Sequence, residues 1–224
     1  MSSSGDAVDF GDLTSNRRGS GIGPSSNAIR GIFAGGVTPA NQGTIDFVTI
    51  ASAGDASNFG DLNSTPISSM AMASTTRGII GGGYPTPANT NIIDFITIAS
   101  TGDAQDFGDL PSTAFGCGNG YGNSIRGEFS GGNPSTPATA RQSFIFATKG
   151  NASKFGDLLV TRDNHMSASS PTRCIIAGGT VSGSPSNQIE YVNPTTSGSA
   201  VDTNTSFANA PSGAAGLSNA HGGL

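Results

Sequence analysis

The chain has 224 residues, of which 11% are charged, and its net charge is −5. This length suits one large all-β domain. The lysines and arginines are spread singly, so nucleic acid is not an expected partner. No run approaches the roughly 18 apolar residues of a membrane helix, and the opening "MSSSGDAVDF" has neither the basic nor the apolar region of a signal peptide. We therefore expect no membrane insertion and synthesis in a cytoplasm.

The tetrapeptide FGDL occurs four times along the chain, at intervals of 49, 48 and 48 residues. It belongs to a longer repeat, and a degenerate partial fifth copy follows at 198–224. The four full copies span residues 5–53, 54–101, 102–149 and 150–197. Units of this period cannot bury both faces alone, so they are expected to stack on one another.

Each repeat contains four short β-like segments, which copy two and the start of copy three show in chain order. Ile67–Ala73 is small and weakly apolar, Arg77–Gly83 ends in glycines, Ile92–Ala99 alternates β-branched and aromatic residues, and Ala104–Leu110 closes the set. Gly and Pro interrupt every window of helix length, which predicts an all-β fold. Four strands per unit are typical of a β-propeller, with the small strand innermost. A parallel β-solenoid is the main alternative.

A small strand, a strand ending in a double glycine and an "IDF"-type strand follow in the order that resembles a kelch repeat. The kelch tryptophan is missing, since the chain has no Trp. Four phenylalanines take its place on the outer strand: Phe10, Phe59, Phe107 and Phe155. The sequence pattern "RGIFAGG…TIDFVTIAS…GDAxDFGDL" is similar to kelch-like repeats of structural proteins in tailed phages, especially marine and cyanobacterial ones. The resemblance covers about residues 5–197.

This resemblance implies a kelch-like β-propeller of four four-stranded blades, or five if the partial repeat adds one. It implies a non-enzymatic virion protein, displayed on a tail, fibre or capsid surface for host attachment or decoration. Its partners would be other virion proteins and a host-surface glycan or protein, with the chain oligomeric within the particle. The alternatives are a cellular or secreted carbohydrate- or protein-binding module and an enzyme with an axial pocket.

The way the ring closes is predicted from the first and last copies of the outer strand. The first, "GDAVDFGDL", keeps the Phe and Leu that the last, "GSAVDTNTS", has lost. A buried Phe or Leu contributes roughly 1.5–3 kcal/mol to stability. We therefore expect residues 5–13 to complete the blade made by 164–192, and residues 198–224 to leave the ring as a C-terminal appendage.

The polar residues that recur in every repeat are expected to be structural, because catalysis requires a unique constellation. The Gly-Asp of FGDL predicts a tight turn whose Asp bonds backbone amides, with Ca²⁺ binding as the weaker alternative. The repeated arginines are expected to pair with Asp46, Asp94 and Glu190 within each blade, or to grip an anion on the axis. These arginines are Arg30, Arg77, Arg126 and Arg173.

No cofactor or metal site is expected. The double glycines predict turns, because no helix follows to bind phosphate. Cys117 and Cys174 are interpreted as idle thiols, with a disulfide between neighbouring units as the alternative. No Cys/His cluster has metal-ligand spacing.

Recognition is expected in two sets of irregular loops, which lie on the same rim of a kelch-type blade. The first set connects outer to inner strands: 14–22, 63–69, 111–121 and 159–165. The second follows the glycine pairs: 37–44, 84–91, 133–140 and 180–188. Five residues in or beside these loops have side chains of the kind usually exposed for binding: Tyr84, Phe115, Tyr121, Arg162 and His165. Abundant Ser, Thr and Asn would suit a sugar or protein surface.

Overall fold

The computed structural model describes residues 6–19, 25–83, 90–111, 118–132 and 139–213. Over these ranges the chain forms strands, turns and bends and no helix, which confirms the all-β prediction. Tyr84, Phe115 and Cys117 lie outside the described residues. The strands build four antiparallel sheets and one small hairpin.

The sheets follow one another along the chain. The first contains β1 (Arg30–Ala34), β2 (Thr44–Thr49) and β3 (Ser57–Asp61). The second contains β4 (Met70–Ala73), β5 (Arg77–Gly81), β6 (Ile92–Thr97) and β7 (Gln105–Asp109). The third contains β8 (Asn119–Gly122), β9 (Arg126–Ser130), β10 (Ala140–Ile145) and β11 (Ser153–Asp157). The fourth contains β12 (Met166–Ser169), β13 (Cys174–Ala177), β16 (Gln188–Val192) and β17 (Val201–Ser206), and β14 (Thr180–Val181) pairs with β15 (Ser184–Pro185) in the hairpin.

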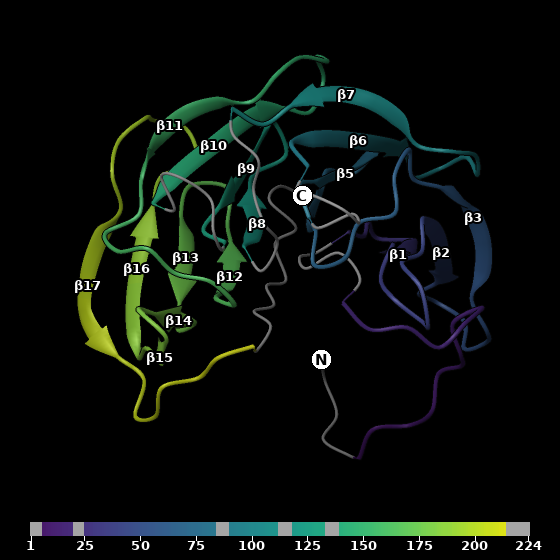
Figure 1. Ribbon diagram of the computed structural model, residues 1–224, viewed down its shortest axis with the longest axis horizontal. Helices are drawn as coiled ribbons and strands as arrows, with labels where there is room; N and C mark the ends of the chain where they lie inside the picture. The colour runs from purple at the N-terminus through teal and green to yellow at the C-terminus, as the bar shows by residue number, and fades with distance from the viewer. Residues whose placement is uncertain (1–5, 20–24, 84–89, 112–117, 133–138, 214–224) are drawn as a thin grey trace.

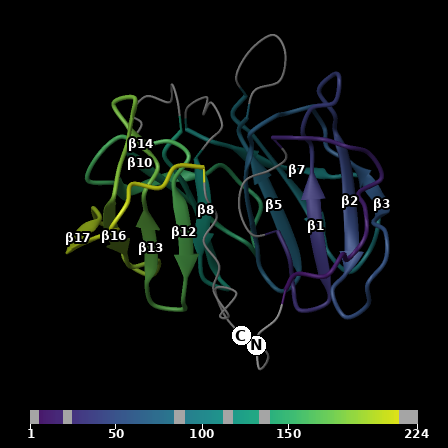
Figure 2. The ribbon, with the colours of Figure 1, turned by 90° about the horizontal axis from the view of Figure 1, so that it is seen from below.

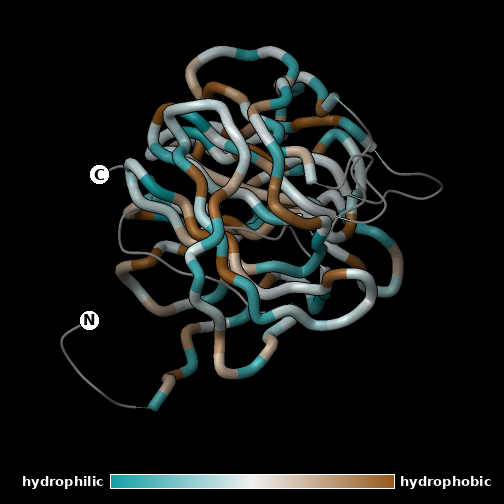
Figure 3. Tube along the Cα trace, turned by 90° about the vertical axis from the view of Figure 1, so that its left-hand side faces the viewer, coloured by the Kyte–Doolittle hydropathy of each residue, from teal (hydrophilic) through white to brown (hydrophobic). Residues whose placement is uncertain are grey.

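The four sheets are arranged side by side in an arc, with the first strand of each sheet toward the centre and the last on the periphery (Figure 1). Figure 2 shows the β14–β15 hairpin at one end of the strands. In Figure 3 hydrophobic and hydrophilic stretches alternate at short intervals, as expected for short strands that join at turns. The four β-like segments that the sequence predicts for copy two correspond to β4, β5, β6 and β7.

Small residues in the first strands allow neighbouring sheets to approach closely. All four residues of β4 and of β8 are buried, so these strands are covered on both faces. A Cβ at Gly120 on β8 would overlap the carbonyl of Ala71 on β4. The glycine at this position therefore permits contact between the backbones of the second and third sheets.

Consecutive sheets pack face to face through apolar side chains. We call the face of a sheet toward the preceding sheet its leading face, and the opposite face its trailing face. Between the first and second sheets, trailing residues such as Ile32 and Ile45 pack on leading residues such as Ile80 and Ile96. Between the second and third, Ile79 and Ile93 meet three phenylalanines: Phe129, Phe144 and Phe146. The third and fourth sheets share a smaller cluster of the same kind.

The phenylalanine of FGDL occupies two of these interfaces. Phe59 is buried between the first and second sheets, and Phe107 between the second and third. The Phe107 ring lies edge-on to Phe95 of its own sheet at 6.0 Å and to Phe144 of the next sheet at 5.8 Å between centroids. The predicted packing of this residue between units is therefore confirmed at these two positions.

Hydrogen bonds also tie each FGD segment to the GDA-like segment of the following repeat. Gly102 and Ala104 donate their amides to the carbonyls of Phe59 and Asp61, at 2.7 and 2.8 Å. The side chain of Asp103 accepts the amide of Asp61 at 3.0 Å. The same pair of backbone bonds recurs for Phe10 and Asp12, Phe107 and Asp109, and Phe155 and Asp157.

The prediction that Gly-Asp of FGDL makes a tight turn is wrong, because FGD ends the strands β3, β7 and β11. The aspartate that accepts a backbone amide belongs to the GDA segment instead. Gly60 has a φ of 152°, and a Cβ there would overlap the Gly102 carbonyl. This glycine is therefore required by the close approach of two repeats and not by a turn.

The prediction of closure by the N-terminal strand is also wrong. Residues 201–206 form β17, which pairs with β16 as the outer strand of the fourth sheet. Residues 198–206 are therefore part of the fold, and not an appendage. The Phe position is Thr203 here, because no described sheet follows the fourth against which a phenylalanine could be buried.

Residues 6–13 instead lie in front of the first sheet. The carbonyls of Phe10 and Asp12 accept the amides of Gly54 and Ala56 at 2.7 and 2.8 Å. The carbonyls of β3 accept the amides of Gly102 and Ala104 in the same way. The N-terminal segment thus occupies the outer-strand position of a unit preceding the first sheet. At the other end, Gly179 donates to the carbonyl of Pro211 and Gly213 donates to that of Asn164, so residues 207–213 are hydrogen-bonded to the rim loops of the fourth sheet. No described strand lies between the fourth sheet and the first.

Two copies of the same motif provide a matched test of the packing. Phe107→Ala removes a ring that is 2% exposed, and we expect it to lower the free energy of unfolding by about 3–5 kcal/mol. Phe10 is 40% exposed, so Phe10→Ala should cost less than half as much. Urea denaturation of the two variants checks this, and equal losses would contradict the assigned packing.

Candidate functional site

The two sets of loops predicted to share a rim do pair in the first and fourth sheets. Val37 donates to the carbonyl of Arg18 at 2.9 Å, and Thr180 donates to that of Asp163 at 2.8 Å. Each bond joins the connection before a first strand to the loop after a glycine pair. Beside the first sheet these loops open a cavity of about 460 Å³. Its lining consists of Asn16, Arg17, Arg18, Val37, Thr38 and Pro39.

The three described residues among the five binding candidates are buried, which contradicts their predicted exposure. Tyr121 lies on β8 and packs between the third and fourth sheets. Arg162 and His165 lie in the connection before β12, where neighbouring backbone encloses them. Tyr121 is buried because it lies on a first strand that is covered on both faces, and Arg162 and His165 are buried because the connection before β12 is itself enclosed. None of the three can contact a surface ligand in this arrangement.

His165 is enclosed between the third and fourth sheets. Its carbonyl accepts the side-chain amide of Asn119 at 3.0 Å, and its ring lies against the backbone of Gly131. Neither ring nitrogen has a hydrogen-bond partner among the residues that the structure describes. Burial, together with the nearby Arg162 charge, lowers the pKa of His165 to about 3. The imidazole is therefore neutral near pH 7.

Arg162 and Arg17 hold equivalent places in the fourth and first sheets. The Arg162 guanidinium pairs with Glu190 at 3.0 Å, and that of Arg17 pairs with Asp46. All four side chains are buried. Both arginines also donate to the backbone carbonyl of the first residue of a strand, which is Thr44 of β2 for Arg17 and Gln188 of β16 for Arg162. These buried pairs fasten the rim connections to the sheets.

Each buried carboxylate also accepts the amide of the residue that follows FGDL. Asp46 accepts from Thr14, Asp94 from Asn63 and Glu190 from Leu159, at 2.8 to 3.1 Å. Burial raises the pKa values of Asp94 and Glu190, and these hydrogen bonds oppose the shift. The third sheet has Gln142 at this position, and there the residue after FGDL is Pro111, which has no amide proton to donate.

The repeated arginines do not pair with these carboxylates, so that prediction is wrong. Three of them lie instead over an aromatic ring of the next strand, at 4.5 to 5.0 Å from the ring centroid: Arg30 over Phe47, Arg77 over Phe95 and Arg173 over Tyr191. The third sheet has Ser143 at the aromatic position. Arg126 donates to its hydroxyl at 3.0 Å and lies over Phe155. The arginines cover aromatic rings through cation–π contacts.

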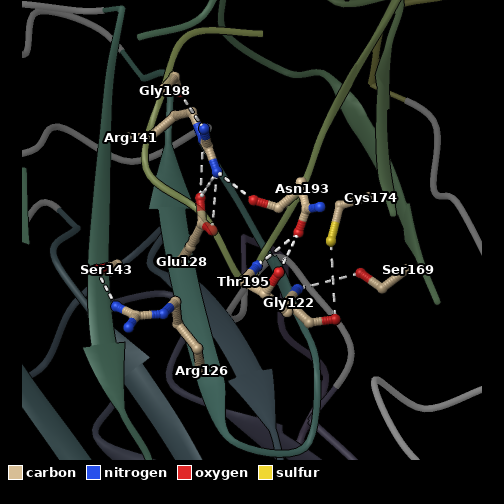
Figure 4. Close-up of polar contacts among 10 residues, drawn as sticks. All are labelled: Gly122, Arg126, Glu128, Arg141, Ser143, Ser169, Cys174, Asn193, Thr195 and Gly198. Carbon is tan, nitrogen blue, oxygen red and sulfur yellow. Dashed lines mark hydrogen bonds and ion pairs between the residues drawn. The ribbon is translucent and has the colours of Figure 1, made fainter. Parts of the chain in front are cut away.

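The third sheet contains a buried ion pair that the sequence reasoning missed. Figure 4 shows Arg141 on β10 directed at Glu128 on β9. The two N–H···O hydrogen bonds are both 2.9 Å long, and both side chains are at most 1% exposed. Arg141 also donates to the carbonyls of Asn193 and Gly198, which lie between β16 and β17 of the fourth sheet. This pair therefore connects two sheets as well as two strands.

The same two positions are isoleucines in the other sheets. Ile32 and Ile45 occupy them in the first sheet, Ile79 and Ile93 in the second, and Ile175 and Ile189 in the fourth. The sequence signal that could have revealed the pair is the replacement of both isoleucines by oppositely charged residues in the same repeat. Burial raises the pKa of Glu128 to about 7, and Arg141 opposes this shift.

Reactive groups near this pair are shielded. The Cys174 thiol is free and buried, and its Sγ lies 3.7 Å from the carbonyl oxygen of Gly122, to which it donates. Burial raises the pKa of Cys174 to about 12, which keeps the thiol protonated. No cluster of three potential metal-ligating side chains occurs in the described parts of the chain. Within those parts no helix is long and apolar enough to cross a membrane.

No protein-family model matches the chain, and no curated protein sequence is similar to it.

The buried pair can be tested by restoring the residues of the other repeats. Glu128→Ile alone strands the Arg141 charge, and we expect a loss of about 3–5 kcal/mol in the free energy of unfolding. The double variant Glu128→Ile/Arg141→Ile should recover to wild-type stability or above, because two isoleucines fit these positions in three sheets. A double variant as unstable as the single one would contradict this account in a urea titration.

The buried imidazole predicts a pH dependence of stability. The pKa of His165 is lower in the folded chain than the ordinary value near 6.5, so its stabilising contribution is complete above that value and is lost as pH falls toward 3. Between pH 6.5 and 4.5, wild type should lose roughly 1.4 kcal/mol per pH unit more than His165→Gln. Urea titrations across this range provide the measurement. Parallel pH profiles would show that the ring is accessible to protons.

Proposed function

We propose that the chain is a kelch-like β-propeller protein and a non-enzymatic component of a tailed-phage virion. Its place would be the tail, a fibre or the capsid surface, where it attaches the particle to a host or decorates it. The observation that carries the architecture is the repeated sheet, in which a small first strand lies centrally and the FGD strand peripherally (Figure 1). Propeller blades have this strand order.

The packing of the described residues supports a structural role. The recurrent Phe, Arg and Asp side chains are engaged between strands or between consecutive sheets. Buried carboxylates are paired with arginine or backbone amides, and within the described residues neither nitrogen of the His165 ring has a hydrogen-bond partner. A virion component must persist outside the cell, and interlocked repeats suit that requirement.

A ligand-binding module, cellular or secreted, is the second candidate, and the rim cavity of the first sheet favours it. Arg18, Asn16 and Thr38 offer donors and acceptors there, and the cavity is open to solvent. A sugar or a protein loop fits such an open lining, in which polar and apolar groups are mixed, better than a purely apolar ligand does. On a phage particle the same surface would serve recognition of the host.

The virion assignment can be decided on particles. Mass spectrometry of density-purified virions from an infected culture that expresses this chain should detect it at a constant ratio to the major capsid protein. Detection only in the lysate supernatant would contradict the proposal. Immunogold labelling of intact particles would then assign the chain to tail, fibre or capsid.

The recognition surface can be tested on a glycan array and on host cells. Arg18→Ala should reduce binding of the purified chain at least fivefold, because Arg18 is exposed at the rim. Arg173→Ala is the matched control, since Arg173 is also exposed but lies over Tyr191 away from this cavity. Equal losses for the two variants would contradict recognition at this rim.

A further inference from the structure

The leading face of the first sheet is open where the same face of every other sheet is covered. Phe33 and Ile50 on this face are 39% and 46% exposed. The equivalent residues of the second sheet, Ile80 and Ile98, are 2% and 0% exposed. In the third sheet they are Phe129 and Phe146, which are also buried. The leading face is thus buried by a preceding sheet in the second, third and fourth sheets, and it is left uncovered only in the first of the four described sheets.

The N-terminal segment covers part of this leading face. Residues 8–12 hold the position of an outer strand, and Phe10 and Leu13 lie over the first sheet as Phe59 and Leu62 lie over the second. These two residues line a cavity of about 410 Å³. The remaining lining residues are Gly11, Asp12, Phe33, Val48 and Ile50.

Comparison with the interface between the first and second sheets shows what the cavity lacks. There the outer strand β3 pairs with β2, and Ile45 of β2 is fully buried against the second sheet. In front of the first sheet, no described strand pairs with residues 8–12. The vacant element is therefore an extended strand beside residues 8–12, carrying an aliphatic side chain at the Ile45 position.

We propose that the leading face of the first sheet is a docking surface for a β-strand of a partner protein. The strand would pair antiparallel with residues 8–12, as β2 pairs with β3 and β6 with β7. It would place a β-branched aliphatic side chain against Phe33, Val48 and Ile50. Its residues would resemble those of β2 and β6, which share the consecutive sequence Ile-Asp-Phe. Addition of a strand to an open edge, with a pocket for alternate side chains, is a general mode of peptide recognition.

The test uses a peptide with the sequence of residues 90–99, TNIIDFITIA, extended by two lysines for solubility. The chain has no tryptophan, so Ile50→Trp places a single fluorescent reporter in the cavity. Titration with the peptide should give a saturable blue shift as the strand covers the indole. A peptide in which Ile93 is replaced by aspartate should bind at least tenfold more weakly, because it would bury a charge.

Variants of the protein locate the binding. Val48→Asp on the reporter background should abolish the shift, and Phe33→Ser provides a second variant if Val48→Asp fails to fold by circular dichroism. Val201→Asp is the matched control, since Val201 is 47% exposed on β17 of the fourth sheet. It should leave the titration unchanged.

Three outcomes would overturn the proposal. The first is the absence of a saturable shift with the unmodified peptide. The second is an equal shift with the aspartate peptide or with a folded Val48→Asp or Phe33→Ser protein. The third is a blue shift that rises with protein concentration without peptide and accompanies a larger sedimentation coefficient. That result would assign the face to a second copy of the chain.

Discussion

The fold depends on the contact between one sheet and the next, in which the outer strand of each unit is fixed to the start of the following outer strand. Phe59 and Phe107 are buried in these contacts, while Gly102, Ala104, Gly150 and Ala152 donate their amides to the FGD backbone. Because the phenylalanine packs against two units, neither unit buries its apolar surface alone. The recurrence of FGDL at a nearly constant interval follows from this requirement.

Buried polar groups also join one segment of the chain to another, through hydrogen bonds and ion pairs. Asp46, Asp94 and Glu190 hold the connections that lead from one sheet to the next, and Gln142 replaces them where Pro111 removes the donor. The third repeat exchanges two isoleucines for the Glu128–Arg141 pair. A buried ion pair of this kind adds little to the net stability, but it favours the packing arrangement in which both charges keep their partners. It distinguishes the contact between the third and fourth sheets from the other two.

Repetition and strand content could be predicted from the sequence, because glycine clusters and alternating apolar residues determine them locally. The positions of β4, β5, β6 and β7 followed from one repeat, as did the burial of Phe59 and Phe107. Pairing between distant segments could not be predicted as well. The loss of Phe at Thr203 was interpreted as loss of the strand, although β17 pairs with β16 and lacks only a following sheet.

The candidate site was predicted less completely than the fold. The shared rim that the kelch resemblance implies is confirmed for the first and fourth sheets. Tyr121, Arg162 and His165 nevertheless proved to be buried, since residue type alone does not show whether a side chain near a loop faces the interior. The aromatic partners of Arg30, Arg77 and Arg173 were missed because opposite charge on the next strand was a simpler expectation. The ion pair between Glu128 and Arg141 could be recognised only when the two positions were aligned with the isoleucines of the other sheets.

Amide hydrogen exchange measured by NMR tests the central claim, that the outer strands β3 and β7 are each fixed to a complete following sheet, whereas the leading face of the first sheet is open. The amides of Gly102, Ala104, Gly150 and Ala152 should exchange at the slow rate of global unfolding. Those of Gly54 and Ala56, which donate to residues 10 and 12 of the uncovered segment, should exchange at least roughly 100-fold faster. Equal protection at all six amides would contradict an open leading face, and rapid exchange at Gly102 and Ala104 would contradict the contact between sheets itself.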